Sequence, residues 1–143
     1  MKIVIVGSGM QGRACAFDLL RNPALEELTL VDAAAENLAA VKRFLKSAKI
    51  RLLRADAGDL ARIKKIAVGN DVLISCVPYY YNLGLAKAAI SAKTDYVDLG
   101  GNTEIVLKEL ALHESAKKAG VTLLPDVGLV PGMTTTLAVH AMK

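Results

Sequence analysis

The feature that most constrains the fold is a glycine-rich segment directly after the first apolar run of the chain. Lys2–Gly7 has the pattern of a buried strand, and the loop that follows is Gly7-Ser8-Gly9-Met10-Gln11-Gly12. A strand, then G-x-G-x-x-G, then a helix-period segment is typical of a dinucleotide-binding unit, although glycines alone would be a weak signal. We expect Gly7 to permit a tight turn, Gly9 to admit a pyrophosphate and Gly12 to let the helix approach the strand. We therefore predict that all six loop residues contact a coenzyme; an ordinary turn is the alternative.

Apolar runs of strand length alternate with segments of helical period along the whole chain. The predicted strands are Lys2–Gly7, Leu28–Asp32, Ile50–Ala55, Asp71–Val77, Tyr96–Leu99 and Val121–Pro125. The predicted helices are Gly12–Arg21, Ala35–Ser47, Asp59–Val68, Leu83–Lys93, Thr103–Ala119 and Met133–Lys143. Apolar strands joined by helices imply parallel βαβ units with right-handed crossovers. We predict one α/β domain over residues 1–143, a doubly wound Rossmann sheet of about six strands in the order 3-2-1-4-5-6, with three αβα layers.

Composition and charge exclude several classes of protein. With 143 residues, of which 53% are hydrophobic and 22% charged, the chain can bury a core and is not disordered. The net charge of +4 comes from basic residues spread over the predicted helices, so we expect no nucleic-acid partner. The first apolar run is too short to span a membrane and lacks a signal-peptide pattern. Cys15 and Cys76 have no metal-ligand spacing. We expect a cytoplasmic protein with no metal and no membrane partner.

Asp32 ends the second predicted strand, where an acid commonly binds the hydroxyls of the adenosine ribose. A 2′-phosphate there would meet the carboxylate at contact distance, a repulsion of roughly 1–4 kcal/mol depending on the dielectric. Ala33, Ala34 and Ala35 follow and provide no cation or hydroxyl. We therefore predict NAD as the coenzyme in preference to NADP. A solvated acid at the end of a strand is the less favoured alternative.

Further coenzyme contacts are expected where the other strands end, because ligands of open α/β sheets bind at the carboxyl edge. After the third strand these are Asp56 and Ala57, and Asp56 serves equally well as a turn residue. The remaining candidates follow the fourth and fifth strands and are Cys76, Val77, Pro78, Leu99 and Gly100. We reject Cys76 as a nucleophile, because no histidine or helix N-terminus is evidently directed at it.

Catalytic residues are not identified by these patterns. Asp98 and Asp126 are weak candidates, because each lies where a strand ends near paired or clustered glycines. His113 and His140 fit structural or solvent-facing positions better. The run Tyr79–Tyr81 fits two interpretations equally, a cover over the nicotinamide or a cover over the helix that follows.

Taken together, these motifs resemble those of the saccharopine dehydrogenase family. Within that family, the resemblance is to the lysine 6-dehydrogenase-like members. The segments that carry the resemblance run in order along the chain and are VGSGMQG, VD at Asp32, CVPYYYN at 76–82, YVDLGGN at 96–102 and DVGLVPGM at 126–133. The resemblance implies an NAD(P)-dependent oxidation of a carbon–nitrogen bond in an amino acid. Hydride would pass from the amine-bearing carbon to C4 of the nicotinamide, giving an imine that water then opens.

The resemblance also implies a second α/β domain, inserted after Asp126–Gly132, that provides most of the substrate pocket. We expect that domain after residue 143, a homo-oligomer for the full-length protein, and no turnover by this chain alone. The alternative is a stand-alone nucleotide-sensing Rossmann module of the kind that gates potassium channels, although such a sensor needs neither YVDLGGN nor GLVPGM. A semialdehyde dehydrogenase is a weaker third interpretation, because Cys76 lacks the setting of an acylating thiol.

Overall fold

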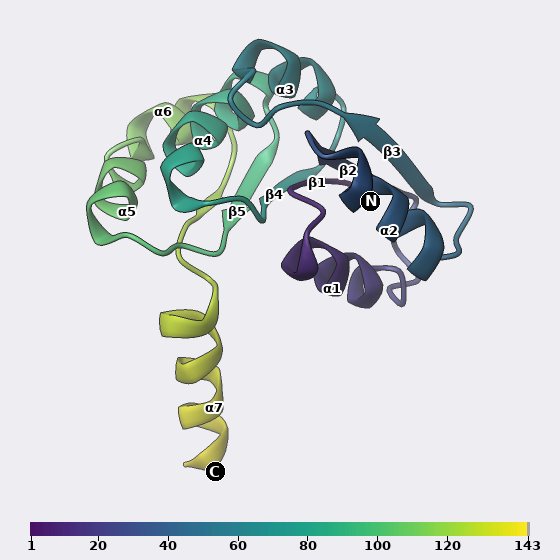
Figure 1. Cartoon of the computed structure of the whole chain (residues 1–143). Helices are drawn as coiled ribbons and strands as arrows, with labels where there is room; N and C mark the ends of the chain where they lie inside the picture. The colour runs from purple at the N-terminus through teal and green to yellow at the C-terminus, as the bar shows by residue number, and fades with distance from the viewer. Residues whose placement is uncertain (143) are drawn as a thin grey trace.

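A six-stranded parallel sheet organises the chain, and its strand order confirms the predicted fold (Figure 1). The computed structural model describes residues 1–142. The strands are β1 (Lys2–Val6), β2 (Glu27–Asp32), β3 (Ile50–Arg54), β4 (Val72–Ser75), β5 (Asp95–Asp98) and β6 (Leu123–Leu124). They pair in the order β3-β2-β1-β4-β5-β6, and every pair is parallel. The strand order reverses between β1 and β4, which defines the switch point of the sheet.

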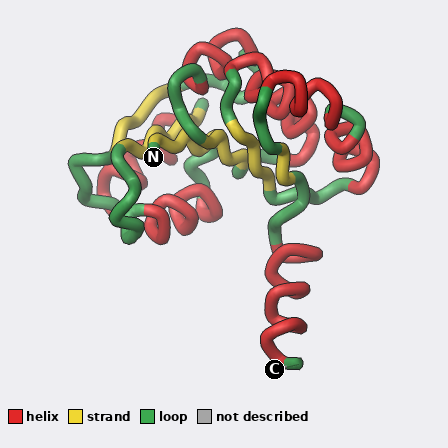
Figure 2. Tube along the Cα trace, turned by 180° about the vertical axis from the view of Figure 1, so that it is seen from behind, coloured by secondary structure: helices red, strands yellow, loops and turns green. Residues whose placement is uncertain are grey.

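Helices cover both faces of this sheet. They are α1 (Met10–Leu19), α2 (Ala35–Phe44), α3 (Leu60–Ala67), α4 (Asn82–Ala92), α5 (Thr103–Leu110), α6 (His113–Ala119) and α7 (Thr134–Ala141), with a 3-10 turn at Tyr79–Tyr81 and a distorted turn at Leu129–Met133. Figure 2, seen from behind, shows the strands lying between the helical layers. The three-layer arrangement is therefore the one expected from alternating strands and helices.

The alternation of side chains along β1 divides the core into two halves. Ile3 and Ile5 are buried with residues of α1 and α2, whereas Val4 and Val6 are buried with residues of α3 and α4. Successive side chains of a strand point to opposite faces, so one continuous apolar strand supplies both halves. This is why β1 shows no polar alternation in the sequence.

The predicted helix over Thr103–Ala119 is wrong as a single element, because it breaks between α5 and α6. Leu112 packs against the core cluster on the α3–α4 face, and Ala116 is buried one turn further on. The break at 111–112 divides the segment into two helices, and both α5 and α6 contact α4. The break also leaves Glu109, in the last turn of α5, only 1% exposed.

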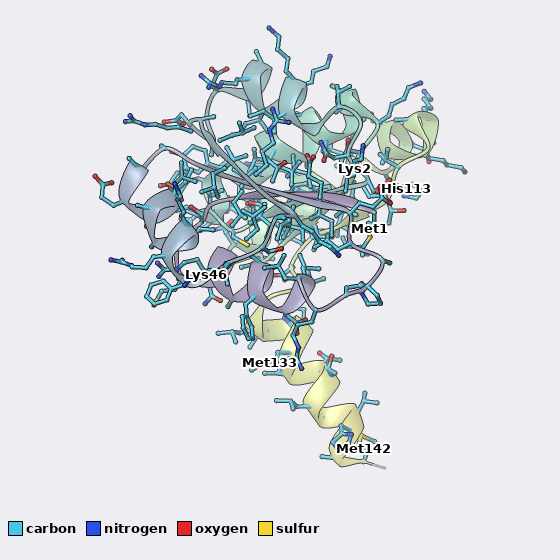
Figure 3. The ribbon with its side chains drawn as sticks, turned by 90° about the vertical axis from the view of Figure 1, so that its right-hand side faces the viewer. Met1, Lys2, Lys46, His113, Met133 and Met142 are labelled. Carbon is cyan, nitrogen blue, oxygen red and sulfur yellow. The ribbon has the colours of Figure 1, made fainter. Side chains whose placement is uncertain are left out.

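The carboxyl-terminal elements also differ from the expectation. Only Leu123 and Leu124 of the predicted strand Val121–Pro125 pair with β5, and Pro125 has no N–H with which to continue the ladder. The helix expected over Met133–Lys143 is described as α7 at Thr134–Ala141, and Lys143 lies outside the described residues. In Figures 1 and 3, α7 extends away from the sheet, and Met133 and Met142 lie along it. No residue of α7 is buried.

The contact between α1 and the end of β1 allows a direct test of the fold. A Cβ on Gly12 would overlap the carbonyl oxygen of Gly7, whereas a Cβ on Gly9 would meet no heavy atom within 4 Å. We expect Gly12→Ala to lower the free energy of unfolding by about 3 kcal/mol, the upper end of the cost of overpacking. Gly9→Ala, the matched control, should change it by about 1 kcal/mol or less. Urea unfolding followed by circular dichroism measures both, and equal stability of the two variants would contradict this packing.

Candidate dinucleotide-binding site

The glycine loop lies between the ends of β2 and β4, at the switch point. Gly7 has a φ of +95°, and its N–H donates to the carbonyl oxygen of Val31 at 2.8 Å. A Cβ on Gly7 would lie 2.6 Å from the carbonyl oxygen of Cys76. Glycine is therefore required here by both the left-handed backbone and the contact with the end of β4.

The first turn of α1 faces open space. Gly9 precedes this ten-residue helix, no side chain caps it, and a Cβ on Gly9 would contact nothing within 4 Å. The first N–H groups of an α-helix have no partner within the helix, and they lie at the positive end of its dipole. This arrangement of donors and free space suits the diphosphate of a dinucleotide.

Asp32 holds the loop in place with both of its carboxylate oxygens. Oδ2 accepts hydrogen bonds from the N–H of Ser8 at 2.7 Å, the hydroxyl of Ser8 at 3.1 Å and the side-chain amide of Asn37 at 3.1 Å. Oδ1 accepts from the N–H of Ala34 at 2.8 Å. Partial burial alone would raise the pKa of Asp32, but these donors outweigh it and hold the pKa below its ordinary value. A carboxylate offers about four acceptor positions, and the protein itself supplies four donors.

Arg54 lies beside the same turn. It ends β3 and pairs in register with Asp32, and its Nε donates to the carbonyl oxygen of Ala33 at 3.1 Å. Sequence periodicity does not reveal this neighbour, because Arg54 is distant along the chain and only the pairing of β2 with β3 places it there. The signal available in the sequence is the strand order, which sets the last residues of the second and third strands side by side.

A cavity of about 120 Å³ opens between the ends of β1, β2 and β3. Its lining includes five of the expected coenzyme residues, Gly7, Asp32, Asp56, Ala57 and Val77, together with Tyr81. Asp56 also acts as a turn residue, since its Oδ1 accepts the N–H of Gly58 at 2.6 Å. The two interpretations of Asp56 are therefore compatible.

A second cavity, of about 530 Å³, lies on the other side of the switch point. It is formed by Gln11 of α1, the loop after β5 and the segment after β6, and its lining residues are Gln11, Leu99, Gly101, Val127, Gly128, Leu129, Val130 and Met133. The structure thus brings the glycine loop and the two later glycine segments to one edge of the sheet. This convergence is expected because each segment follows the carboxyl end of a parallel strand.

The tyrosine run connects the two cavities. Tyr81 lines the smaller one, and the Cβ of Tyr79 lies 3.5 Å from where a Cβ of Gly101 would be, beside the larger one. Tyr80 packs between its neighbours, with ring centroids 5.7 Å from Tyr79 and 4.7 Å from Tyr81. The run therefore faces the candidate site at both ends as well as preceding α4.

The two weak catalytic candidates occupy different environments. Asp98 is fully buried, and its Oδ1 accepts the N–H of Gly100 at 2.6 Å and that of Asp126 at 3.0 Å. Asp126 is half-buried, with a φ of +64°. Asp98 is thus placed to hold the loops, and of the two only Asp126 has an exposed part.

Cys76 and Pro78 follow the end of β4, and Cys15 lies in the middle of α1. A hydrogen bond to Cys15 and burial both raise the pKa of Cys76, so its thiol stays protonated. A protonated thiol is a poor nucleophile, which agrees with the exclusion of Cys76 from that role. Pro78 directs the chain out of the strand into the tyrosine turn.

Within residues 1–142 no group of three or more histidine, cysteine, aspartate or glutamate side chains is placed to hold a metal ion. No helix in that range is both long enough and apolar enough to cross a membrane.

Comparison with known proteins identifies relatives over nearly the whole chain. A family model described as "Saccharopine dehydrogenase NADP binding domain" matches residues 3–124. Saccharopine dehydrogenase (NADP⁺, L-glutamate-forming) of Saccharomyces cerevisiae is 29% identical over 140 residues, and carboxyaminopropylagmatine dehydrogenase of Synechocystis sp. is 28% identical over 153. The solved structure of the yeast enzyme, without ligand, superposes with a TM-score of 0.81 at 26% identity.

These relatives are much longer than this chain. The alignments cover 98% of this chain and 30% of the yeast enzyme, and 99% of this chain and 38% of the Synechocystis enzyme. The superposed structure likewise matches 30% of the yeast protein.

The prediction that Asp32 selects NAD over NADP is wrong, because the matching family is described as NADP-binding. Two features explain the error. The oxygens of Asp32 accept four hydrogen bonds within the protein, so this acid has a structural task that does not require NAD. Arg54 also places a cation beside Ala33, although the residues that immediately follow Asp32 in the sequence are all alanines.

The alternative of a stand-alone sensing module gains no support from these comparisons. The family match covers most of the chain, and both relatives named above are dehydrogenases. This chain therefore belongs to the saccharopine dehydrogenase NADP-binding domain family.

Proposed function

We propose that this chain binds NADP(H) at the carboxyl edge of its sheet, as the coenzyme domain of an oxidoreductase that acts on a carbon–nitrogen bond of an amino acid. The observation that carries the proposal is the open, uncapped start of α1 at Gly9, which lies between the two cavities. A dinucleotide has a diphosphate at its centre and a ring system at each end. In the proposed site, N–H groups that can bind an anion lie at the centre and a cavity lies on each side. This arrangement matches that of the diphosphate and the two ring systems of a dinucleotide.

The adenosine end of the coenzyme is assigned to the smaller cavity. Asp56, Ala57 and Tyr81 line this cavity, and Asp32 borders it. Arg54 is the proposed partner of the 2′-phosphate, because one of its five N–H groups donates to Ala33 and the terminal ones remain for a phosphate. The four donors around Asp32 reduce the repulsion that its charge would otherwise exert on that phosphate.

The nicotinamide end is assigned to the larger cavity. Gln11, Leu99 and Val127 line it, with Asp126 beside them. When bound, NADP⁺ supplies a hydride acceptor at C4 of the nicotinamide. The loops of this chain would orient the ring and exclude water from one side of it. Asp126 is the residue of this chain best placed to touch a substrate.

A second domain would complete the pocket. The relatives extend far beyond the aligned region, and α7 presents exposed apolar side chains at Leu137, Val139 and Met142. Exposed apolar side chains with no core contact are suited to packing against another domain of a longer protein. We therefore propose that the substrate domain packs against α7.

Replacing Arg54 tests the assignment of the phosphate. Arg54→Ala should weaken NADPH binding roughly ten- to a hundredfold, the value of a charge-assisted hydrogen bond, and leave NADH binding unchanged. Isothermal titration calorimetry with both coenzymes measures the two affinities. Arg51→Ala, on the same strand and also exposed, is the matched control and should affect neither. An equal loss for both coenzymes would remove Arg54 from the phosphate site.

Replacing Gly9 tests the diphosphate position. Gly9→Val should abolish NADPH binding, because its side chain would occupy the space at the start of α1, and Gly9→Ala should weaken binding to a smaller degree. Calorimetry gives the affinities, and circular dichroism shows that both variants keep the fold. Normal binding by Gly9→Val would mean that the loop is only a turn.

Because a second domain is proposed to supply the rest of the substrate pocket, we expect that this chain alone does not turn over an amino acid. Its loops line one side of an open cavity, whereas catalysis requires the donor carbon to be held close to C4 with water excluded. NADPH formation from L-lysine or saccharopine, followed by absorbance, should stay at the background rate with the isolated chain. Turnover at an ordinary enzymatic rate would show that the chain contains the complete catalytic site.

A further inference from the structure

Two buried carboxyl groups, those of Asp98 at the end of β5 and Glu109 of α5, lie within interaction distance of each other. Asp98 ends β5 and is 0% exposed, and Glu109 in α5 is 1% exposed. Oδ2 of Asp98 and both oxygens of Glu109 are buried and accept no hydrogen bond from any described residue. A buried charge without partners is strongly unfavourable, and a protein usually relieves it by keeping the group protonated.

The surroundings of Glu109 supply no ion pair that would stabilise a second negative charge. Tyr96 and Asp98 face it from β5, and Asp126 faces it from the segment after β6. His113 and Lys117 of α6 line a cavity of about 320 Å³ that Glu109 also borders, but neither pairs with Glu109 among the described ion pairs. The charged residue of α4, Lys87, is exposed.

The other oxygen of Asp98 joins the two loops of the larger cavity. Oδ1 accepts the N–H groups of Gly100 and Asp126, and the carbonyl oxygen of Asp98 accepts the N–H of Val127 at 3.0 Å. Asp126 has a left-handed backbone, which is uncommon for a residue other than glycine and needs support from its surroundings. A Cβ on Gly100 would overlap the carboxylate of Asp126, so the two loops are in direct contact.

We propose that Asp98 and Glu109 share one proton, with the Glu109 carboxyl donating to Oδ2 of Asp98, and that this proton positions the loops after β5 and β6. Its effect on the coenzyme rests on the proposed function, whereas the shared proton does not. Glu109 is thus a positioning residue that acts through Asp98. Loss of the proton would set two carboxylates against each other and force Asp98 to move, releasing Gly100 and Asp126.

The pH range over which the shared proton is lost follows from the pKa of Glu109. Burial, and then the charge of Asp98, raise that pKa from its ordinary value of 4.5 to about 8. The folded chain therefore holds the proton more tightly than the unfolded chain does. The contribution of the pair to stability is fully present below about pH 4.5 and is lost as the pH rises through about 8.

Nuclear magnetic resonance of the chain with ¹³C-labelled glutamate carboxyls and ¹⁵N-labelled amides tests the shared proton directly. One glutamate should titrate near pH 8, and the amide signals of Gly100 and Asp126 should move with the same midpoint. Glu109→Gln should remove that midpoint and hold both amide signals at their low-pH positions, because its amide donates to Asp98 as the proton does. Glu104→Gln, exposed on the same helix, is the matched control and should keep the wild-type titration.

Asp98→Asn is a second variant that tests the shared proton if Glu109→Gln does not fold. It removes the neighbouring negative charge, so the midpoint of Glu109 should fall toward its ordinary value. An ordinary Glu109 midpoint in the wild-type chain would overturn the proposal. Amide signals of Gly100 and Asp126 that do not follow Glu109 would also overturn it.

Calorimetry with NADPH tests the link to the site. Above about pH 8 the affinity of the wild-type chain should fall by up to about tenfold per pH unit, the limit for one linked proton, and that of Glu109→Gln should stay constant. A constant wild-type affinity together with titrating loop amides would overturn the coupling to the coenzyme. Absence of NADPH binding at every pH would contradict the proposed function and leave the shared proton to stand on the resonance data.

Discussion

The carboxylate of Asp32 joins three segments that meet at the switch point of the sheet. It binds Ser8 of the glycine loop, Ala34 of the turn after β2 and Asn37 of α2. Since Ser8 immediately precedes Gly9, these hydrogen bonds fix the backbone where the proposed diphosphate position begins. Every feature assigned to the adenosine end, from the small cavity to Arg54, is arranged around this carboxylate. Charge-assisted hydrogen bonds to backbone N–H groups are among the stronger ones in proteins, so the loop is held in shape before any ligand arrives.

A second strand-end acid, the buried Asp98, performs a similar task across the switch point. It binds the backbone of Gly100 and Asp126, just as Asp32 binds the backbone of Ser8 and Ala34. The two ends of the proposed coenzyme site are therefore shaped in the same way, by an acid at the end of a strand that orders the loops beside it. The two acids differ in their surroundings. Asp32 accepts four hydrogen bonds, whereas Oδ2 of Asp98 has no donor other than the proposed Glu109 carboxyl.

The order of the strands and the position of the glycine loop could be predicted because both depend on local patterns, namely the apolar runs and the strand–glycine–helix order. The break between α5 and α6 could not, because 103–119 has an uninterrupted helical pattern and only the packing of Leu112 against the core divides it. The role of Asp32 and the position of Arg54 depend on contacts between distant segments. A strand-end acid looks the same in sequence whether it faces a ribose or the backbone of its own protein.

The pairing of Ser8 with Asp32 has a consequence for how related sequences are interpreted. An acid at the end of the second strand counts as evidence about the coenzyme only when the glycine loop offers no side chain that engages it. In a loop of the form G-S-G, the hydroxyl of the serine and its backbone N–H compete with the ribose for the same oxygen. Under the proposed role of Arg54, the final residue of the third strand then becomes the informative position. Redesign of coenzyme selectivity in such a domain would begin at β3 and leave the acid of β2 untouched.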